Sequence, residues 1–353
     1  RTPNLSLGPK IPEFEEEFAS YIGAKHAVAV NSGTSGLHLC VRALGIQAGD
    51  EVITTPFSFI ASANCLLFER AKPVFADIRE DTLNMDEDRI EERITNKTKA
   101  ILPVHVFGYP CNMGKIRRLA KKHGLAIIED ACEAVGAEIA GRKAGTFGTA
   151  AVFAFYPNKQ MTTGEGGMIV TNDKKIAALA RSMCNQGRDE GMGWLAHNRL
   201  GYNYRLSDIN CALGLAQLKR IVAILAKRAQ VAEQYSQRLA AIDEVSLPPL
   251  DRGTINRSWF VYVIRLAPEF SETQRNKIIY ALRARGIGCN VYFPAIHLQP
   301  FYRNSFGYKP GDFPITEQVS ARTIALPFFN NLKEKQMDYV ARSLQEIIKE
   351  VKK

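Results

Sequence analysis

Short apolar stretches recur along the first half of the chain, and segments with a helical spacing of apolar positions separate them. Several of these stretches are apolar at every position, which is typical of strands that helices cover on both faces of a sheet. The predicted strands are residues 27–30, 51–55, 73–76, 100–106, 126–129, 150–155 and 168–171. The helices predicted around them are residues 11–22, 34–44, 58–69, 86–94, 112–123 and 173–184. This alternation predicts an α/β fold with a mostly parallel seven-stranded sheet.

The pattern changes at residues 206–239, which form one long helical stretch with Ser207 or Asp208 as its candidate N-cap. The elements expected after it are a strand over residues 259–265, a helix over 272–285, a strand over 289–293 and two helices that end at Lys353. We therefore expect a large domain over residues 1–240, which includes the long helix, and a smaller α+β domain over residues 241–353.

The composition is that of an ordinary folded protein, because 46% of the 353 residues are hydrophobic. No apolar run approaches the roughly 20 residues that a membrane-spanning helix needs, so we expect no membrane partner. The seven cysteines are odd in number and lack a C-x-x-C spacing, which favours reduced thiols in the cytoplasm. The six histidines lack the paired spacing of a metal site, so we expect no metal.

The net charge of +10 raises the question of a nucleic-acid partner. Nucleic-acid-binding proteins usually cluster their basic residues, whereas here these residues are mixed with acids and form only short groups such as residues 115–118. We therefore expect no nucleic-acid partner. The charge indicates either solvated helix faces or a field that attracts an anionic substrate.

A first segment with candidate chemistry is residues 31–36, which lies between a predicted strand and a predicted helix. A turn that contains glycine and leads into a helix gathers free backbone N–H groups at the positive end of the helix dipole. Gly33, Thr34 and Ser35 are therefore candidates for binding a phosphate group. An ordinary capped turn fits these residues equally well.

A second segment is the apolar strand that ends in Asp130. Ligand sites in open α/β sheets lie beyond the carboxyl ends of the strands. A carboxylate at such a place can pair with a protonated ring nitrogen of a cofactor and keep the ring cationic. The alternative is that Asp130 caps a following helix.

A third segment surrounds Lys159, which follows the aromatic stretch 153–156 and precedes the glycine-rich stretch 164–167. A lysine in partly desolvated surroundings is suited to form an imine with a carbonyl compound. Glycines after it let the backbone pass close to a cofactor. The alternative is an ordinary surface lysine.

With these three segments in this order, the chain resembles the DegT/DnrJ/StrS-type sugar aminotransferases, which are fold-type I enzymes dependent on pyridoxal 5'-phosphate (PLP). The resemblance covers nearly the whole chain. The segments that carry it are residues 27–35, 50–56, 129–133, 153–167, 201–206 and 297–300.

The resemblance implies a role for each residue that matches a family motif. Lys159 corresponds to the lysine that holds PLP as a Schiff base and moves the proton during transamination. Asp130 corresponds to the partner of the pyridine nitrogen. Thr34, with the backbone at Gly33 and Ser35, corresponds to the phosphate site.

Four further residues are candidates near the cofactor or the substrate. By the resemblance, Phe59 corresponds to the aromatic residue that stacks on the cofactor ring. Asn203 corresponds to an asparagine that reaches the phosphate of a neighbouring subunit, which implies a homodimer with shared active sites. His297 lies where the family has a loop near the sugar, although a structural histidine fits equally. Arg188 is a candidate for a substrate phosphate, with a surface arginine as the alternative.

Two positions depart from the usual family pattern. Glu133 stands where the family often has a glutamine that hydrogen-bonds the cofactor's 3'-oxygen, and a carboxylate there would repel a phenolate unless one of the two is protonated. Some members of the family that the chain resembles have glutamate here and form 4-amino sugars, so the resemblance slightly favours a 4-amino sugar as the product. Ala154 stands where the family usually has a serine that donates to the phosphate. Asn158, Thr162 or Thr163 are candidates to compensate.

We therefore expect a PLP-dependent aminotransferase that transfers an amino group from glutamate to a nucleotide-linked keto-sugar, for amino-sugar or surface-polysaccharide biosynthesis. An amino-cyclitol or a related compound without a nucleotide is the alternative product. A PLP-dependent sugar dehydratase is a weaker alternative, since those proteins resemble this one but carry histidine in place of Lys159. A non-catalytic regulator has only the basic charge in its favour.

Overall fold

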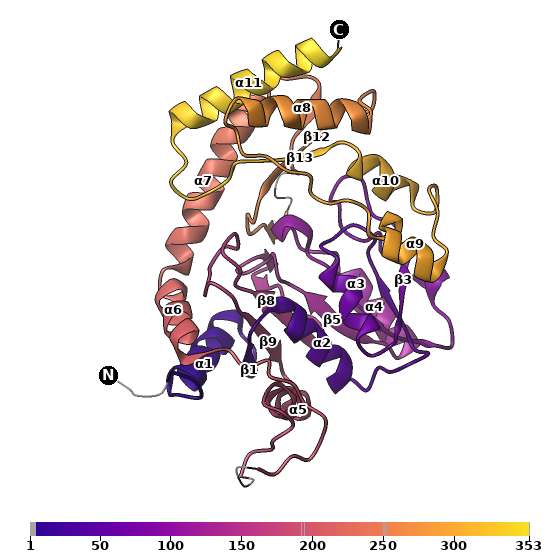
Figure 1. The fold of residues 1–353 in the computed structure, drawn as a ribbon, viewed down its shortest axis with the longest axis vertical. Coiled ribbons are helices and arrows are strands. Elements are labelled where there is room, and N and C mark those ends of the chain that lie inside the picture. The colour runs from indigo at the N-terminus through magenta and orange to yellow at the C-terminus, as the bar shows by residue number, and fades with distance from the viewer. Residues whose placement is uncertain (1–4, 192, 194, 250, 252, 353) are drawn as a thin grey trace.

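The computed structural model describes residues 5–191, 193, 195–249, 251 and 253–352. A seven-stranded sheet in the order β1-β9-β8-β5-β4-β2-β3 forms its centre (Figure 1). The strands are β1 (His26–Val30), β2 (Glu51–Thr54), β3 (Lys72–Phe75), β4 (Thr98–Ile101), β5 (Ala126–Asp130), β8 (Ala150–Ala154) and β9 (Gly167–Thr171). Strand β9 is antiparallel to both of its neighbours, β1 and β8, and the pairs from β3 to β8 are parallel. The predicted seven-stranded, mostly parallel sheet is confirmed.

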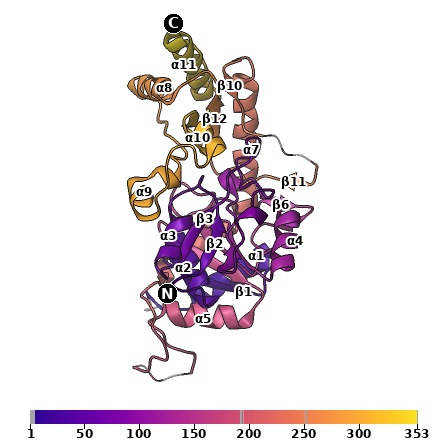
Figure 2. The ribbon, with the colours of Figure 1, turned by 90° about the vertical axis from the view of Figure 1, so that its right-hand side faces the viewer.

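Helices cover both faces of this sheet (Figure 2). They are α1 (Lys10–Ile22), α2 (Gly33–Ala43), α3 (Ala61–Leu67), α4 (Met113–His123), α5 (Lys174–Cys184) and α6 (Asp208–Leu218). Val28 and Val30 of β1 pack with α2 and α5, whereas Ala29 packs with α1 and α6 on the opposite face. Every residue of β8 and β9 is buried. The uniformly apolar strands are therefore explained by a sheet that is enclosed on both sides.

The helix predicted over residues 86–94 is wrong, because only a short 3-10 turn, η1 (Glu91–Arg93), forms there. The N–H of Asp86 donates to the carbonyl oxygen of Asp77, and the carboxylate of Asp86 accepts the N–H of Asp88. Local side-chain bonds of this kind offer the backbone an alternative to the helical pattern.

After α6, helix α7 (Ile221–Leu239) leads to the C-terminal region, by which we mean the chain from residue 241 onward (Figure 1). Its centre is an antiparallel sheet in the order β10-β12-β13. Its elements are β10 (Val245–Ser246), β12 (Tyr262–Leu266), α8 (Glu272–Ala284), η3 (Ile296–Leu298), α9 (Pro300–Phe306), α10 (Pro314–Ser320), β13 (Thr323–Leu326) and α11 (Glu334–Lys352). The domain division after residue 240 stays a prediction.

A third, small sheet and one more 3-10 turn lie on the loops that follow β4 and β5. The sheet consists of β11 (Ile255–Asn256), β6 (Glu138–Ile139) and β7 (Arg142–Lys143), and the turn is η2 (Val106–Gly108). Because β11 pairs with β6, the segment before β12 is attached to the loop after β5. This pairing brings the start of the C-terminal region close to the carboxyl edge of the main sheet.

The expectations for the C-terminal region hold only in part. The strand predicted over residues 289–293 is wrong: Asn290 makes an isolated bridge with Ala325, and its own side chain accepts the N–H of Val291. The unpredicted β13 pairs with β12 instead. Three helices, α9 to α11, follow where two were expected, and the expected end at Lys353 lies outside the described residues.

The long stretch predicted over residues 206–239 consists of two helices, α6 and α7, which meet at a 63° bend. Ser207 caps α6 by accepting the N–H of Asn210, at 3.2 Å. The bend lets α6 pack on α1 while α7 packs on α11. In the described part of the chain no single helix is long and apolar enough to cross a membrane, although the bent pair would be by length and composition alone.

One buried carboxylate attaches α10 to the end of the main sheet. Asp77 follows β3, and its two oxygens accept the N–H groups of Ile315 and Thr316 at 3.0 Å each and the hydroxyl of Thr316 at 2.7 Å. The first N–H groups of a helix have no partner within the helix. Asp77 therefore caps α10 from a distant part of the chain and holds the C-terminal region against the sheet.

Replacing Asp77 with asparagine should destabilise the protein, because an amide offers only one accepting oxygen for these donors. We expect the free energy of unfolding to fall by about 1–2 kcal/mol, measured by urea denaturation. The matched control is Asp81→Asn, which removes an exposed pair with Arg79 and should change stability little. Equal effects of the two variants would contradict the capping role of Asp77.

Candidate active site

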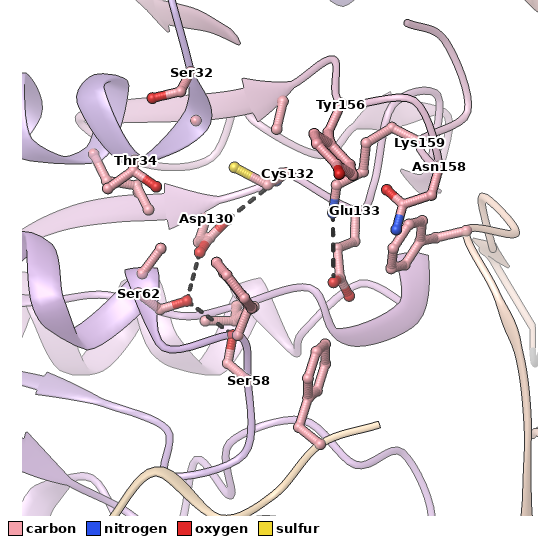
Figure 3. A pocket seen from close by; sticks show the side chains of 18 of the residues that line it. Ser32, Thr34, Ser58, Ser62, Asp130, Cys132, Glu133, Tyr156, Asn158 and Lys159 are labelled. Atoms are coloured by element: carbon pink, nitrogen blue, oxygen red, sulfur yellow. Dashed lines mark hydrogen bonds and ion pairs between the residues drawn. The ribbon is translucent and has the colours of Figure 1, made fainter. Parts of the chain in front are cut away.

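A cavity of about 490 Å³ lies beyond the carboxyl ends of β1, β2, β5 and β8. Loops after these strands supply one wall, and the C-terminal region supplies the other. Figure 3 shows Thr34, Asp130, Glu133 and Lys159 around this cavity, although they are far apart in the sequence. The structure therefore brings together the three segments that the sequence singles out.

The start of α2 presents unbonded N–H groups to the cavity. Ser32 caps the helix by accepting the N–H of Ser35 at 3.1 Å. Among the described residues no hydrogen-bond partner is found for the N–H groups of Gly33 and Thr34, and both residues line the cavity. Two free N–H groups and a nearby hydroxyl at a helix N-terminus suit an anion such as phosphate.

Ser35 does not have the position that the sequence predicts for it. Its N–H bonds to Ser32, its hydroxyl donates to the side-chain oxygen of Asn31 at 2.7 Å, and it does not line the cavity. Ser35 therefore completes the helix cap. The N–H groups available to a phosphate come from the two residues before it.

Gly33 allows this turn to lie directly over the ends of two strands. A Cβ atom at residue 33 would come within 2.8 Å of the Cys132 sulfur and 2.9 Å of the Ala154 Cβ. No side chain fits in that space without displacing one of these neighbours. Ala154 consequently lies next to the turn that presents the free N–H groups.

The threonines proposed to compensate for Ala154 are occupied elsewhere. The Thr162 hydroxyl donates to the Phe155 carbonyl at 2.9 Å, and the Thr163 hydroxyl donates to the Glu165 carbonyl at 2.6 Å. Neither threonine lines the cavity. Asn158 does line it, but its side-chain amide donates to the Tyr292 hydroxyl at 3.4 Å, so its role at the phosphate stays a prediction.

Asp130 is the last residue of β5 and is buried. One carboxylate oxygen accepts the Ser62 hydroxyl at 2.7 Å, and the other accepts the Cys132 N–H at 3.1 Å. Ser58 lies 2.8 Å from Ser62, so the two serines form a short chain that ends at the carboxylate. The next element after β5 is the strand β6, so the alternative that Asp130 caps a helix is wrong.

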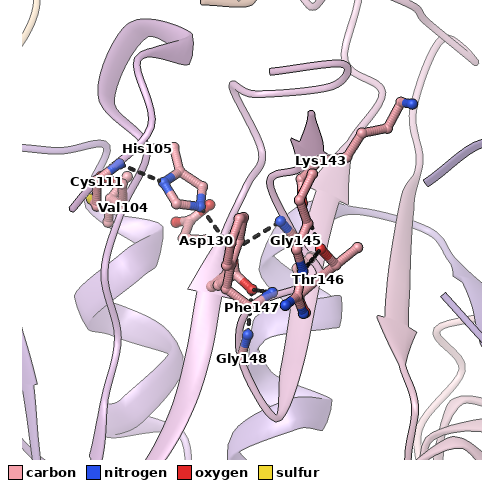
Figure 4. Close-up of polar contacts among 12 residues, drawn as sticks. Val104, His105, Cys111, Asp130, Lys143, Gly145, Thr146, Phe147 and Gly148 are labelled. Atoms are coloured by element: carbon pink, nitrogen blue, oxygen red, sulfur yellow. Dashed lines mark hydrogen bonds and ion pairs between the residues drawn. The ribbon is translucent and has the colours of Figure 1, made fainter. Parts of the chain in front are cut away.

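Glu129, the residue before Asp130 in β5, is held by donors from the loops on either side, among them His105, Gly145 and Gly148 (Figure 4). It is fully buried and accepts the N–H groups of Gly145, Phe147 and Gly148 at 2.8, 2.6 and 2.5 Å. The fourth partner is Nε2 of His105, at 3.1 Å. Sequence reasoning did not identify this network, since acids at strand ends have no distinguishing local pattern.

The tautomer of His105 follows from its two contacts. Its Nδ1 accepts the N–H of Cys111 at 3.0 Å, so this nitrogen carries no proton in the neutral ring. Nε2 therefore carries the proton and donates to Glu129. The network joins the loop after β4, the end of β5 and the loop before β8, and in this way it sets the position of Asp130.

Lys159 lies in the loop between β8 and β9, and 13% of its side chain is exposed. Its Nζ is 3.6 Å from a carboxyl oxygen, Oε1, of Glu133 and 4.0 Å from the centre of the Phe260 ring. These surroundings are partly desolvated, as the sequence predicts. An amine between a carboxyl group and an aromatic face is held in one place and remains accessible from the cavity.

Glu133 is buried beside Lys159, and burial raises the pKa of its carboxyl group. Its Oε2 accepts the N–H of Phe107 at 2.8 Å, which leaves Oε1 to face Lys159. Phe107 has a φ of 54°, an unfavourable value for a large side chain, and its ring packs against Phe57 and Phe293. The packing of the Phe107 ring therefore holds its backbone N–H in position to donate to Glu133.

Among the remaining predicted residues only Phe59 lines the cavity, and 61% of it is exposed. Asn203 lies on the surface, and its carbonyl oxygen accepts the side-chain N–H of Asn31. Neither Asn203 nor Arg188 lines the cavity of this chain. Their roles stay predictions. In the described part of the chain, no group of three His, Cys, Asp or Glu residues is arranged to hold a metal ion.

His297, expected either near the sugar or as a structural histidine, is not among the residues that line the cavity. The side chain is fully buried, its Nε2 lies 3.0 Å from Glu317, and its ring packs edge-on against Phe313. Burial lowers the pKa of His297. The residue therefore packs the interior of the C-terminal region, as the structural alternative holds.

Three aromatic residues of the C-terminal region line the cavity without having been predicted, namely Phe260, Tyr292 and Phe293. The only local signal was the aromatic pair before Pro294. It did not show which way these rings point, because that depends on how the C-terminal region packs on the main sheet.

Comparison with known proteins agrees with this arrangement. The model of the DegT/DnrJ/EryC1/StrS aminotransferase family matches residues 1–345. GDP-perosamine synthase of Caulobacter vibrioides is 41% identical over 344 residues, which cover 97% of this chain and 91% of that protein. Spore coat polysaccharide biosynthesis protein SpsC of Bacillus subtilis is 38% identical over 355 residues, which cover 98% and 91%.

The solved structure of DesV from S. venezuelae superposes with a TM-score of 0.91 at 34% identity, covering 98% of this chain and 91% of that one. Both the sequence and the fold therefore match over nearly their whole length. The chain belongs to the DegT/DnrJ/EryC1/StrS aminotransferase family.

Proposed function

We propose that this protein transfers an amino group from glutamate to the carbonyl carbon of a nucleotide-linked keto-sugar, with PLP as its cofactor. The observation that carries the proposal is the meeting of the Lys159 amine, the buried Asp130 carboxylate and the free N–H groups of α2 around one cavity. Aminotransferases of this family depend on PLP, and two relatives bear the names GDP-perosamine synthase and spore coat polysaccharide biosynthesis protein.

The residues around the cavity fit the parts of PLP. The N–H groups of Gly33 and Thr34 suit the phosphate, and the buried carboxylate of Asp130 suits a protonated ring nitrogen. Lys159 suits a covalent bond to the aldehyde, and Phe59 offers an exposed ring. When bound, PLP supplies a sink for the electrons that remain on a substrate carbon after its proton leaves.

The residues of this chain then have distinct tasks. The Lys159 Nζ removes the proton from the carbon of the amino donor and later delivers a proton to the sugar carbon. Asp130 keeps its partner nitrogen protonated, and its two hydrogen bonds prevent it from turning away. When the Lys159 amine is free, Glu133 and Phe260 hold it inside the cavity.

We further propose that Glu133 is protonated in the working enzyme and donates to the 3'-oxygen of the cofactor. Its Oε2 already accepts the N–H of Phe107, so the carboxyl proton belongs on Oε1, the oxygen that faces Lys159. Burial favours this neutral form by raising the pKa of Glu133. A glutamate can in this way take the place of the usual glutamine.

The nucleotide, the dimer and the cellular location complete the proposal. The net charge of +10 favours an anionic substrate, and Arg188 is a candidate contact for its phosphates. Asn203 is exposed, as a residue that serves a neighbouring subunit must be, and we propose a homodimer with shared sites. All seven cysteines are free, which supports a reducing cytoplasm.

The central prediction concerns Lys159. Wild-type protein loaded with PLP should show the visible absorbance of the bound cofactor, lose it on addition of glutamate, and regain it with an accepted nucleotide keto-sugar. Lys159→Ala should abolish the covalent attachment and slow both half-reactions by roughly 10²–10⁴-fold or more. Lys159→Arg is the control, since it keeps a cation beside Phe260 and Glu133.

Mass spectrometry after borohydride reduction should find the cofactor on Lys159 alone. Attachment at another lysine, or full activity of Lys159→Ala, would contradict the assignment. Recovery of the absorbance with a keto-cyclitol and with none of the nucleotide keto-sugars would instead replace the proposed substrate.

A second prediction concerns the phosphate site. Ala154→Ser places a hydroxyl next to Gly33 and should tighten PLP binding by about tenfold, because a hydrogen bond to a charged group contributes about 1.5–3 kcal/mol. Thr34→Ala should weaken binding by a similar factor, whereas Thr34→Ser keeps the hydroxyl and serves as its control. Fluorescence titration of cofactor-free protein with PLP measures these dissociation constants. If neither residue affects them, the phosphate binds elsewhere.

A third prediction uses the raised pKa of Glu133 in the cofactor-free protein. A carboxyl whose pKa is higher in the folded than in the unfolded state stabilises the fold fully at low pH, and this stabilisation is lost as the pH rises through the folded pKa. The ordinary value is 4.5, so the loss should occur above that pH. Glu133→Gln cannot ionise and should remove this part of the decline.

Urea denaturation across a pH series measures the effect. Glu165→Gln is the matched control, because Glu165 lines the same cavity but is exposed. A wild-type stability that rises with pH in a Glu133-dependent way would contradict the assigned sign.

A further inference from the structure

The wall of the cavity that the C-terminal region supplies is aromatic. The residues of this region that line the cavity are Phe260, Tyr292 and Phe293. Among these described residues the Tyr292 hydroxyl is the only polar side-chain group. Binding sites of this kind use apolar walls for contact area and a few polar groups to fix the orientation of the ligand. On this wall only the Tyr292 hydroxyl can fix the orientation of a ligand by hydrogen bonding.

The Tyr292 hydroxyl has a proton available for a ligand. The side-chain amide of Asn158 donates to its oxygen at 3.4 Å, and in the described part of the chain no acceptor is found for its own proton. Burial raises the pKa of Tyr292, so the phenol stays protonated. The Tyr292 oxygen therefore already accepts one hydrogen bond, and its O–H group remains available to donate another.

The ring of Tyr292 is held firmly in place. It lies 6.2 Å from the ring of Phe107 and 6.3 Å from that of Phe260, with both pairs edge to face, and 4.9 Å from the ring of Phe293. Phe107 belongs to the main sheet's loops and the other two to the C-terminal region. The hydroxyl is consequently directed by packing from both sides of the cavity.

The position of Asn158 places this donor near the reacting amine. Figure 3 shows Ser32 and Thr34 on one side of Asp130, and Asn158 and Lys159 on the other. Since Asn158 is the neighbour of Lys159 in the chain and contacts Tyr292, the phenol lies at the Lys159 end of the cavity. A group bound there is close to the carbon that exchanges its amino group.

We propose that Tyr292 orients the keto-sugar by donating a hydrogen bond to a ring hydroxyl oxygen next to the carbonyl that is aminated. This inference rests on the proposed function and names a residue that selects and places the sugar. A sugar ring has apolar C–H faces and a polar hydroxyl edge, which match two phenylalanine rings and one phenol. A glutamate carboxylate would instead need a cation, and Glu133 lies close to this position.

The test separates the two half-reactions of the PLP-loaded enzyme, followed by the absorbance of the cofactor. The sugar probe is whichever GDP-, UDP- or dTDP-linked keto-sugar the wild type accepts. Tyr292→Phe removes only the hydroxyl. We expect the apparent dissociation constant for the keto-sugar to rise about tenfold, as for loss of one substrate hydrogen bond, while the glutamate half-reaction changes less than about twofold.

Deoxy analogues of the accepted sugar identify the partner atom. Removing one particular ring hydroxyl should weaken binding to the wild type about tenfold and leave binding to Tyr292→Phe unchanged. Tyr339→Phe is the matched control: its exposed hydroxyl donates to the Arg285 carbonyl, far along the chain from the cavity residues, and both half-reactions should keep their wild-type rates.

Each other outcome overturns the inference. If Tyr292→Phe slows both half-reactions alike, the hydroxyl supports the structure of the site. If it changes neither half-reaction, or impairs only the reaction with glutamate, Tyr292 does not place the sugar. A wild-type enzyme that reacts with glutamate but with no nucleotide keto-sugar contradicts the proposed function itself, which is visible without any variant.

Discussion

The buried carboxylate of Glu129 is the interaction on which the site depends. A buried charge is costly unless hydrogen bonds replace its lost water, and here three backbone N–H groups and His105 do so. These donors come from loops on both sides of β5, so the carboxylate fixes where the strand ends relative to its neighbours. Asp130 follows directly and points to the other face of the strand, into the cavity. The hydrogen bonds of Glu129 therefore determine where Asp130 lies.

Much of the fold could be predicted because the main sheet is buried on both faces. Strands such as β8 and β9 have no exposed residue, and a fully apolar run between helices has few other interpretations. The wrong secondary-structure predictions lie where local polar contacts determine the backbone conformation. Asp86 and Asn290 each bind a nearby N–H group with their own side chain, and neither the helix over residues 86–94 nor the strand over residues 289–293 forms.

In the candidate site too, residues whose position follows from the nearby sequence could be predicted, and residues placed by tertiary packing could not. Lys159, Asp130 and Thr34 could be placed together because they follow strand ends, which meet at one edge of a parallel sheet. Tyr292 and Phe260 could not, because their direction depends on the docking of the C-terminal region. His297 has the residue type of a site residue, and only its burial against Phe313 and Glu317 reveals a packing role.

The charges around the cavity limit how this protein can hold a phosphorylated cofactor. Lys159 is the only cationic side chain among the described residues that line the cavity, against the carboxyl groups of Asp130, Glu133 and Glu165. A phosphate dianion added to three carboxylates would meet strong repulsion in a partly desolvated space. The helix N-terminus at Gly33 offsets part of this charge through dipoles, and the burial that raises the pKa of Glu133 disfavours one of the three negative charges. The proposed neutral form of Glu133 fits this limit, because a protonated carboxyl group donates a hydrogen bond where an ionised one would repel the cofactor.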